Sequence, residues 1–183
     1  MTRRCTVEEQ PEGLVSQRDF LDEDEERRAL AVVAEMQFDE IRMRGQTARR
    51  TVRHFGYAYE YETWRLRPTE PLPPELGWLR DRAGAFADVG PADFAQILVS
   101  RYPPGATIGW HRDAPMFGAK VVGVSLAAPC RLRFRRVRGQ TRSVFDLELP
   151  PRSAYLLSGP ARSAWQHSIP PVKDLRYSIT FRT

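Results

Sequence analysis

The chain has 183 residues, a length that fits one domain with a buried core of its own. Its two cysteines, Cys5 and Cys130, lie far apart, which argues against a secreted scaffold built on disulfides. No apolar run is long enough to span a bilayer, and the N-terminus carries Arg3 and Arg4 without an apolar signal region. We therefore expect a cytoplasmic, monomeric protein that does not insert into membranes.

The net charge of +5 and the isoelectric point of about 9.6 favour a polyanionic partner such as nucleic acid. Nearly all of the positive charge is arginine, because Lys120 and Lys173 are the only lysines. The guanidinium group suits forked contacts with phosphate and stacking on bases. A codon bias toward arginine in a GC-rich genome would give the same composition, and both explanations stay open at this stage.

The first predicted elements are a loose segment, a helix and a strand. Residues 1–13 are polar, so we expect a flexible segment before a domain that spans 14–183. Asp22 and Glu25 have the spacing of a capping box, and apolar residues follow at helical spacing. A strand is expected over 38–43.

A basic stretch and a run of alternating aromatic residues come next. Residues 46–53 are polar and basic, and Phe55, Tyr57 and Tyr59 then fall on alternate positions, which is the periodicity of a strand. A proline cluster breaks the chain before a second helix, which is expected over 74–87.

Beyond Pro91 the chain consists of short β-rich runs separated by proline and glycine turns, a pattern typical of an antiparallel sandwich or jelly roll. Because the helices come first and the strands later, we predict an α+β fold: a double-stranded β-helix (jelly roll) braced by N-terminal helices. The domain would divide into helices and a hairpin over 14–93 and a jelly-roll core over 94–183. The expected strands cover 95–102, 120–127, 132–137, 143–149, 153–157 and 177–182.

Two of only three histidines belong to a candidate metal site. His111 and Asp113 form an H-x-D, and on a strand both side chains would point to the same side. His167 would join them from a different strand. Two imidazoles and one carboxylate make a facial triad, which holds Fe(II) and leaves positions open for oxygen and a cosubstrate. The alternative is that all three are ordinary polar residues that satisfy turns and loops.

Several further motifs resemble those of the AlkB family of Fe(II)/2-oxoglutarate dioxygenases. The similarity covers about residues 14–183 and is strongest from Ala95 onward. Its most diagnostic element is the final R-x-x-x-x-x-R, formed by Arg176 and Arg182. The other matching segments are R-Y-P-P-G-A at 101–106, H-R-D at 111–113, V-S-L at 124–126, L-P-P-R-S at 149–153, L-S-G-P-A-R at 157–162 and H-S-I at 167–169.

The resemblance implies a metal site and a cosubstrate site. His111, Asp113 and His167 would ligate Fe(II), and the protein would use 2-oxoglutarate and O2. Arg176 would pair with the distal carboxylate of 2-oxoglutarate, a forked contact that guanidinium makes well. Arg182 would lie near the carboxylate on the metal side. Their spacing of six residues places both arginines on one face of a strand.

Three more residues would complete the cosubstrate site by the same resemblance. Tyr102 would form a hydrogen bond with 2-oxoglutarate. The family usually has asparagine two positions before this tyrosine and two positions after the first arginine. Ser100 and Ser178 stand at those positions here, and both side chains are shorter.

The substrate end of the site would lie on the aromatic and basic stretch. Tyr57 matches a family tyrosine, after a glycine, in a hairpin that grips nucleic acid. Phe55 and Tyr59 would share its face, and Arg53 beside them suits stacking and phosphate contacts. The same alternation would also arise if some of these rings were part of the core.

The expected function is oxidative dealkylation of N-alkylated bases (1-methyladenine, 3-methylcytosine, etheno adducts) in DNA, with RNA as a further substrate. Pro115 stands where some family members have an acidic residue that contacts the damaged base, so the base preference is open. One alternative is the same chemistry on a tRNA, a protein or a small molecule. The other is a catalytically silent module that binds nucleic acid.

Overall fold

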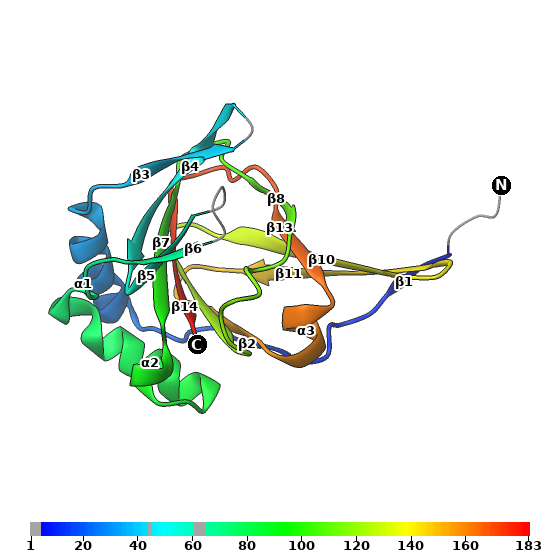
Figure 1. Ribbon diagram of the computed structural model, residues 1–183, viewed down its shortest axis with the longest axis horizontal. Coiled ribbons are helices and arrows are strands. Elements are labelled where there is room, and N and C mark those ends of the chain that lie inside the picture. Colours follow the sequence, from blue (N-terminus) through cyan, green and yellow to red (C-terminus); the bar gives the residue numbers. More distant parts are fainter. Residues whose placement is uncertain (1–4, 44, 61–64) are drawn as a thin grey trace.

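Two β-sheets face each other, and helices cover the outer face of one of them (Figure 1). The computed structural model describes residues 5–43, 45–60 and 65–183. Its two-sheet arrangement is the double-stranded β-helix that the sequence predicts. Within these ranges, no helix is both long and apolar enough to cross a membrane.

The larger sheet has seven strands in the order β2-β12-β9-β14-β7-β4-β3. The last strand in the sequence, β14, lies in the centre and pairs antiparallel with β9 on one side and β7 on the other. The strands predicted over 38–43, 95–102, 120–127, 153–157 and 177–182 all belong to this sheet. Its members are β2 Leu14–Gln17, β3 Asp39–Met43, β4 Gln46–Phe55, β7 Gln96–Tyr102, β9 Val121–Leu126, β12 Ala154–Leu157 and β14 Arg176–Arg182.

The smaller sheet has five strands in the order β1-β11-β10-β13-β8. The strands predicted over 132–137 and 143–149 are both longer, and they form a hairpin of two nine-residue strands. Strands were expected at His111 and at His167 but without bounds, because the four residues of β8 and of β13 give too short a pattern to delimit. The members are β1 Cys5–Glu8, β8 Ile108–His111, β10 Cys130–Arg138, β11 Thr141–Leu149 and β13 Gln166–Ile169.

The N-terminal segment is more ordered than its polar composition suggests. Strand β1 pairs in parallel with β11, with Cys5 opposite Thr141 and Glu8 opposite Val144. The expectation of a flexible segment over 1–13 is therefore wrong for the residues of β1; residues 1–4 lie outside the described part. The backbone groups at the edge of β11 provide partners that no local sequence pattern reveals.

The predicted helices are confirmed, and both pack on the seven-stranded sheet. The first, α1 Glu23–Ala34, begins at the expected capping box, in which Asp22 accepts from the backbone N–H of Glu25 at 2.8 Å. The second comprises a 3₁₀ turn, η1 Pro74–Leu76, and α2 Gly77–Ala87. Apolar side chains of both helices, such as Val33 and Leu79, share one core with Val99 and Ile179 of the sheet.

A second core fills the space between the two sheets. It includes Leu132 and Phe134 of β10 and the buried Trp165, which follows the short helix α3 Gly159–Ser163. Because side chains alternate along β10, Arg133 and Arg135 point away from this core toward the outer surface. The five-stranded sheet is thus apolar inside and basic outside.

The aromatic stretch is a bent hairpin rather than one continuous strand. Strand β4 ends at Phe55, and β5 Tyr57–Glu60 begins after Gly56 and pairs with β6 Arg65–Pro68. Gly56 has φ +78°, and a Cβ atom there would lie 2.4 Å from the carbonyl oxygen of Ala95. Only glycine fits this close turn, which changes the direction of the chain and breaks the alternation across Gly56.

Candidate metal centre and cosubstrate pocket

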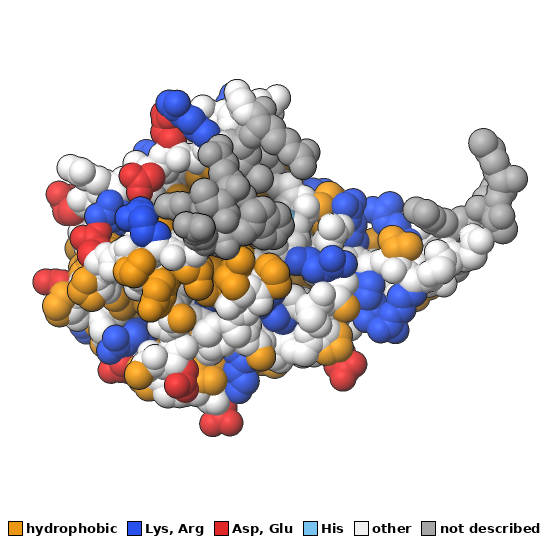
Figure 2. Space-filling model, viewed as in Figure 1, with side chains coloured by type: hydrophobic (Ala, Val, Ile, Leu, Met, Phe, Trp, Pro, Cys, Tyr) orange, Lys and Arg blue, Asp and Glu red, His pale blue; other side chains and the backbone are white. Residues whose placement is uncertain are grey.

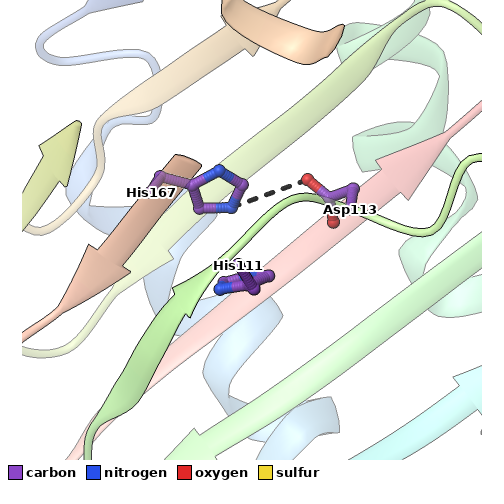
Figure 3. Close-up of side chains that lie close together, drawn as sticks. All are labelled: His111, Asp113 and His167. Carbon is purple, nitrogen blue, oxygen red and sulfur yellow. Dashed lines mark ion pairs between the residues drawn. The ribbon is translucent and has the colours of Figure 1, made fainter. Parts of the chain in front are cut away.

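Three side chains that could bind a metal converge between the two sheets (Figure 3). His111 is the last residue of β8, Asp113 follows in the loop, and His167 lies on β13, opposite His111 in the strand register. Potential ligand atoms of all three lie within 4.8 Å of one another. The prediction that His111 and Asp113 share a strand is wrong, since β8 ends at His111, but the loop still turns both side chains to the same point.

The two histidines are held in the form that a metal needs. The Nδ1 atom of His111 lies 2.8 Å from the carbonyl oxygen of Gly109, so Nδ1–H donates there and Nε2 keeps its lone pair. Burial lowers the pKa of His111, and it lowers the pKa of His167 to about 4. Both imidazoles are therefore neutral near pH 7, as metal ligands must be.

Asp113 is held as a carboxylate by Arg182 of β14. The guanidinium donates to Asp113 Oδ1 from Nε at 3.1 Å and from Nη2 at 2.6 Å. Burial alone would raise the pKa of Asp113, but the positive charge of the Arg182 guanidinium beside it holds that pKa well below its usual range. The third donor, Nη1 of Arg182, reaches Gln96 Oε1 at 2.6 Å.

A second arginine fixes the loop that carries Asp113. Arg162 of α3 is 8% exposed and donates to the carbonyl oxygens of Asp113, Ala114 and Phe117 at 2.8 to 3.3 Å. The loop has no regular hydrogen-bond ladder of its own, so these bonds replace one. The sequence motif contained Arg162, but nothing in its spacing indicated this contact.

A small polar pocket beside the triad contains an arginine with an unused donor. Arg176 is 1% exposed, its Nε donates to Ser125 Oγ at 3.2 Å, and its guanidinium lies 5.1 Å from the centre of the Tyr102 ring. Its Nη1 atom is buried and finds no partner among the described residues. A buried, unpaired guanidinium nitrogen is costly unless an anion binds it, and a carboxylate is an anion that fits a guanidinium group in forked geometry.

The other predicted cosubstrate residues line the same pocket. Tyr102, Ser100 and Ser178 all face it, together with both arginines of β14. The strand register explains why: Ser178 lies opposite Ser100 on β7 and opposite Ser125 on β9. The hydroxyls of three adjacent strands therefore form one polar floor. Ser125 was not among the predicted residues, although V-S-L was part of the recognised motif.

A wider cleft of about 500 Å³ adjoins the small pocket. His111 and Asp113 line both cavities, so a molecule in the cleft would lie next to two of the three candidate metal ligands. The cleft walls include Arg50, Trp110 and Phe117. Pro115 also lines the cleft, at the position where an acidic residue was considered.

Two of the predicted substrate residues do not face this cleft. Phe55 is 3% exposed and packs in the helix-side core, and Arg53 lies over its ring and pairs with Glu70. Both lie on the outer face of β4, because they are opposite Ile97 and Val99 of β7, which face the helices. The assignment of Phe55 and Arg53 to the substrate is wrong for this reason of strand parity.

Arg50 and His54 occupy the inner face of the same strand instead. Arg50 donates to Ser100 Oγ at 3.2 Å and lies 5.7 Å from the centre of the Tyr102 ring. His54 lines the cleft, and burial lowers its pKa from 6.5 to about 4. Had the turn at Gly56 been recognised, counting positions from Ser100 across the sheet would have found both residues.

The hairpin tyrosines have different positions. Tyr57 is 40% exposed, and its carbonyl oxygen accepts from Gln96 Nε2 at 2.8 Å. Because Gln96 also binds Arg182, one buried amide connects the start of the hairpin to the arginine that holds Asp113. Tyr59 lies in β5, but its side chain is outside the described part of the structure.

Comparison with known proteins identifies the class. A model of the 2OG-Fe(II) oxygenase superfamily matches residues 13–182, and the chain therefore belongs to this superfamily. The family uses Fe(II), 2-oxoglutarate and O2. The residues present fit these groups, because the His-Asp-His donor set suits iron and the unpaired buried guanidinium suits a carboxylate. Within the superfamily, the chain is a member of the AlkB family.

The similar proteins carry names of more than one activity. The chain is 33% identical to the alkylated DNA repair protein ALKBH8 homolog of Arabidopsis thaliana, over 86% of this chain and 51% of that protein. It is 29% identical to the tRNA (carboxymethyluridine(34)-5-O)-methyltransferase alkbh8 of Xenopus tropicalis, over 89% of this chain and 26% of that protein. The chain thus spans about half the length of the first relative and about a quarter of the second.

A solved structure supports the fold independently. OsALKBH1 superposes with a TM-score of 0.72 over 97% of this chain and 99% of that chain, at 14% identity. At this identity the likeness extends to the fold and not to the substrate.

Proposed function

We propose that this protein oxidatively removes alkyl groups from nitrogen atoms of nucleobases in DNA. RNA is a further substrate in this proposal. The observation that carries the proposal is that the triad lines a small polar pocket with an unpaired guanidinium, and that two of its residues, His111 and Asp113, also line an adjoining cleft of about 500 Å³. Such a wide cleft is of the size that binds a drug-sized ligand.

Each residue of the inner site has a defined part in the proposal. His111, Asp113 and His167 hold Fe(II), which supplies the activation of O2 and the oxidation of a C–H bond. Arg176 receives the distal carboxylate of 2-oxoglutarate through its free Nη1 atom. Arg182 keeps Asp113 ionised and in one orientation, so it acts on the metal through its ligand.

The side chains around Arg176 position it for this contact. Ser125 holds its Nε, and the Tyr102 ring lies beside its guanidinium plane, so the group is ordered before any ligand binds. Tyr102 and the hydroxyls of Ser100 and Ser178 offer further hydrogen bonds to the cosubstrate. Preordering lowers the entropy cost of binding.

The overall reaction balances without any further reductant. One oxygen atom of O2 enters succinate, which forms from 2-oxoglutarate with release of CO2. The other converts the N-methyl group to N-hydroxymethyl, and this group is lost as formaldehyde with return of the N–H. A base in a duplex must leave the stack to reach the cleft, which costs a few kcal/mol and less at a damaged base that pairs poorly.

The cleft walls support a planar, polar substrate. Trp110 and Phe117 offer apolar surface, and Arg50 and His54 offer polar contacts from the inner face of β4. Tyr57, exposed at the start of the hairpin, is the proposed contact with the nucleotides beside the target base.

The test is a panel of oligonucleotides that carry 1-methyladenine, 3-methylcytosine or ethenoadenine, single- and double-stranded. With Fe(II), 2-oxoglutarate and O2, we expect loss of the adduct mass from at least one of them together with release of succinate. The variant His111→Ala should lose at least about 100-fold in succinate release, because a metal ligand matters at least as much as its supporting shell. Succinate release without loss of any adduct would reject the nucleobase substrate but keep the oxygenase.

A second candidate is the same oxidation on a modified base of tRNA. It is favoured by the name of the Xenopus relative, which refers to tRNA and matches over 89% of this chain. Unfractionated tRNA, digested to nucleosides after reaction and analysed by mass, would gain or lose mass at one nucleoside if this candidate is correct. Unchanged tRNA nucleosides, together with repair of an oligonucleotide by the same protein, would exclude this candidate.

A further inference from the structure

A basic groove lies next to the substrate cleft, at the far end of the five-stranded sheet. We call it the arginine groove; it is a cavity of about 380 Å³. Four of its seven lining residues are arginines and none is acidic. The lining residues are Arg112, Arg135, Arg136, Val137, Arg142, Ala164 and Gln166.

The arginine groove and the substrate cleft share a wall. Arg112 lines both cavities, and it directly follows the candidate metal ligand His111 in the sequence. Trp110, on the other side of His111, lines the cleft and lies 4.4 Å from the Arg135 guanidinium, measured to the ring centre. A chain-like ligand that enters the cleft can therefore continue into the groove without crossing a barrier of the opposite charge.

The guanidinium groups of the groove are held in place. Arg135 donates from Nε to Gln166 Oε1 at 2.9 Å while it stacks on Trp110. Arg112 reaches the carbonyl oxygen of Ala164 at 3.5 Å. Arginines fixed in this way lose little conformational entropy when an anion binds them.

Arg136, in the same groove, has a donor that no described residue uses. Its side chain is 9% exposed and lies 4.8 Å from the centre of the Trp165 ring, and Nη2 donates to Glu9 at 3.0 Å. Its Nε atom is buried and has no hydrogen-bond partner within the described residues. Gathering four cations around one cavity is unfavourable unless an anion compensates their charge.

The charge of the surface has the same bias. Lys and Arg side chains gather over the part of the molecule formed by β10, β11 and β1, while acidic side chains lie mainly over the helical half (Figure 2). Arg131, on the outer face of β10, pairs with Glu148 at 2.9 Å, whereas among the four groove arginines only Arg136 has an acidic partner within the described residues, Glu9. The groove therefore carries more positive charge than its one acidic partner balances.

We infer that the arginine groove binds the phosphodiester backbone of the nucleic acid strand whose base occupies the cleft. This inference rests on the proposed function and adds to it the path of the strand. Guanidinium groups match phosphate oxygens in forked geometry, and a strand offers one phosphate per nucleotide. The strand leaves the cleft past Trp110 and Arg112 and runs toward Arg135 and Arg142.

The test is the salt dependence of binding to a fluorescent, undamaged oligothymidylate of roughly 12 nucleotides, a length within the usual range of single-strand site sizes. The variant Arg135→Gln/Arg142→Gln removes two groove charges. If each arginine neutralises one phosphate, the slope of log affinity against log salt should decrease in magnitude by about 1.4 relative to wild type.

The matched control is Arg27→Gln/Arg131→Gln. It removes the same net charge, but Arg27 pairs with Asp24 on α1, Arg131 pairs with Glu148, and neither lines the groove. We expect the control to keep the wild-type slope. An equal change of slope in both double variants, or a wild-type protein that does not bind the oligothymidylate, would overturn the inference.

Two further measurements keep the outcome clear. Thermal melting shows whether the groove variant folds; if it does not, Arg142→Gln alone, at an exposed position, should lower the slope by about 0.7. Succinate release by wild-type protein without oligonucleotide tests the oxygenase separately. If wild-type protein releases succinate but the slope is unchanged in the groove variant, the groove inference is rejected and the oxygenase function is retained. If the slope decreases as expected but no succinate is released, the oxygenase function is rejected and phosphate binding by the groove is retained.

Discussion

The inner faces of the two sheets of this jelly roll both line the candidate site, but their outer faces differ in character. The seven-stranded sheet is covered outside by α1 and α2, so residues such as Val99 and Ile179 are buried there and only its inner face meets ligands. The five-stranded sheet has arginines outside, at positions 131, 133 and 135 of β10. One sheet therefore carries the two arginines of the small pocket on its inner face, and the other offers a basic surface to solvent.

This difference separates two kinds of arginine. Arg176 is buried and the Arg182 side chain is only 12% exposed, and each makes a specific contact, Arg176 with Ser125 and Arg182 with Asp113. The arginines of the outer face are partly exposed and act together through their charge. A buried arginine should therefore matter through geometry, and an exposed one through ionic strength. Three arginine variants test this distinction and a fourth experiment tests a histidine on the inner face, in order from the largest expected effect to the smallest.

The largest effect is expected at the inner face. Arg176→Gln should lower kcat/KM for 2-oxoglutarate by about 100-fold, because the distal carboxylate loses a charge-assisted, forked contact in a buried site. Steady-state release of succinate at varied 2-oxoglutarate measures it. Arg176→Lys keeps the charge but not the fork and should recover only part of the loss. An unchanged KM for 2-oxoglutarate in both variants would remove Arg176 from the site.

The next largest effect is expected at the loop that carries Asp113. Arg162→Gln should lower the free energy of unfolding by about 2 kcal/mol, since three carbonyl oxygens lose a buried charged donor. For a chain of this size that corresponds to a decrease in Tm of roughly 4–8 °C. The iron concentration needed for half-maximal succinate release should also rise. A normal Tm with normal iron dependence would show that the loop is held by other contacts.

A smaller effect concerns pH and His54. Its pKa is about 4 in the folded protein against 6.5 ordinarily, so the unfolded chain binds more protons between these values. Its contribution to stability is therefore complete above 6.5 and declines as the pH falls toward 4. From about pH 7.5 to about pH 5.5, wild type should lose on the order of 1 kcal/mol more than His54→Gln. Urea unfolding at the two pH values tests this; equal losses would contradict it.

The smallest effect is expected on the outer face. Arg131→Gln should change the free energy of unfolding by less than about 0.5 kcal/mol, because its ion pair with Glu148 is more than half exposed. Arg131→Lys serves as the control that keeps the charge. A loss as large as that of Arg162→Gln would break the proposed contrast between the two sheets.

The parts of the site that could be predicted follow from regular periodicity. Arg176, Ser178 and Arg182 fall on one face of β14 because a flat central strand keeps its alternation over seven residues. Phe55 and Arg53 were placed on the wrong face because the glycine turn after β4 interrupts the alternation on which that assignment depended.

Other features could not be predicted because they depend on residues distant in the sequence. Gln96 binds His54, Tyr57 and Arg182, which come from three separate elements, and no local pattern marks it. Strand β1 acquires its structure from the edge of β11, more than 130 residues away. The contacts of Arg162 could not be predicted for the same reason, since its partners lie 45 to 49 residues earlier.

The central place of β14 has a consequence for how the protein folds. Strands β7 and β9 both precede β14 in the sequence, and they lie on either side of it in the sheet, so only β14 connects them by hydrogen bonds. Until residues 176–182 insert, each of them presents an open edge, which is a site of misassembly. The same insertion delivers Arg176 and Arg182. A molecule that has closed its larger sheet has therefore also placed both arginines in the small pocket, so closing this sheet and forming the arginine side of the pocket are a single event, and one of high contact order.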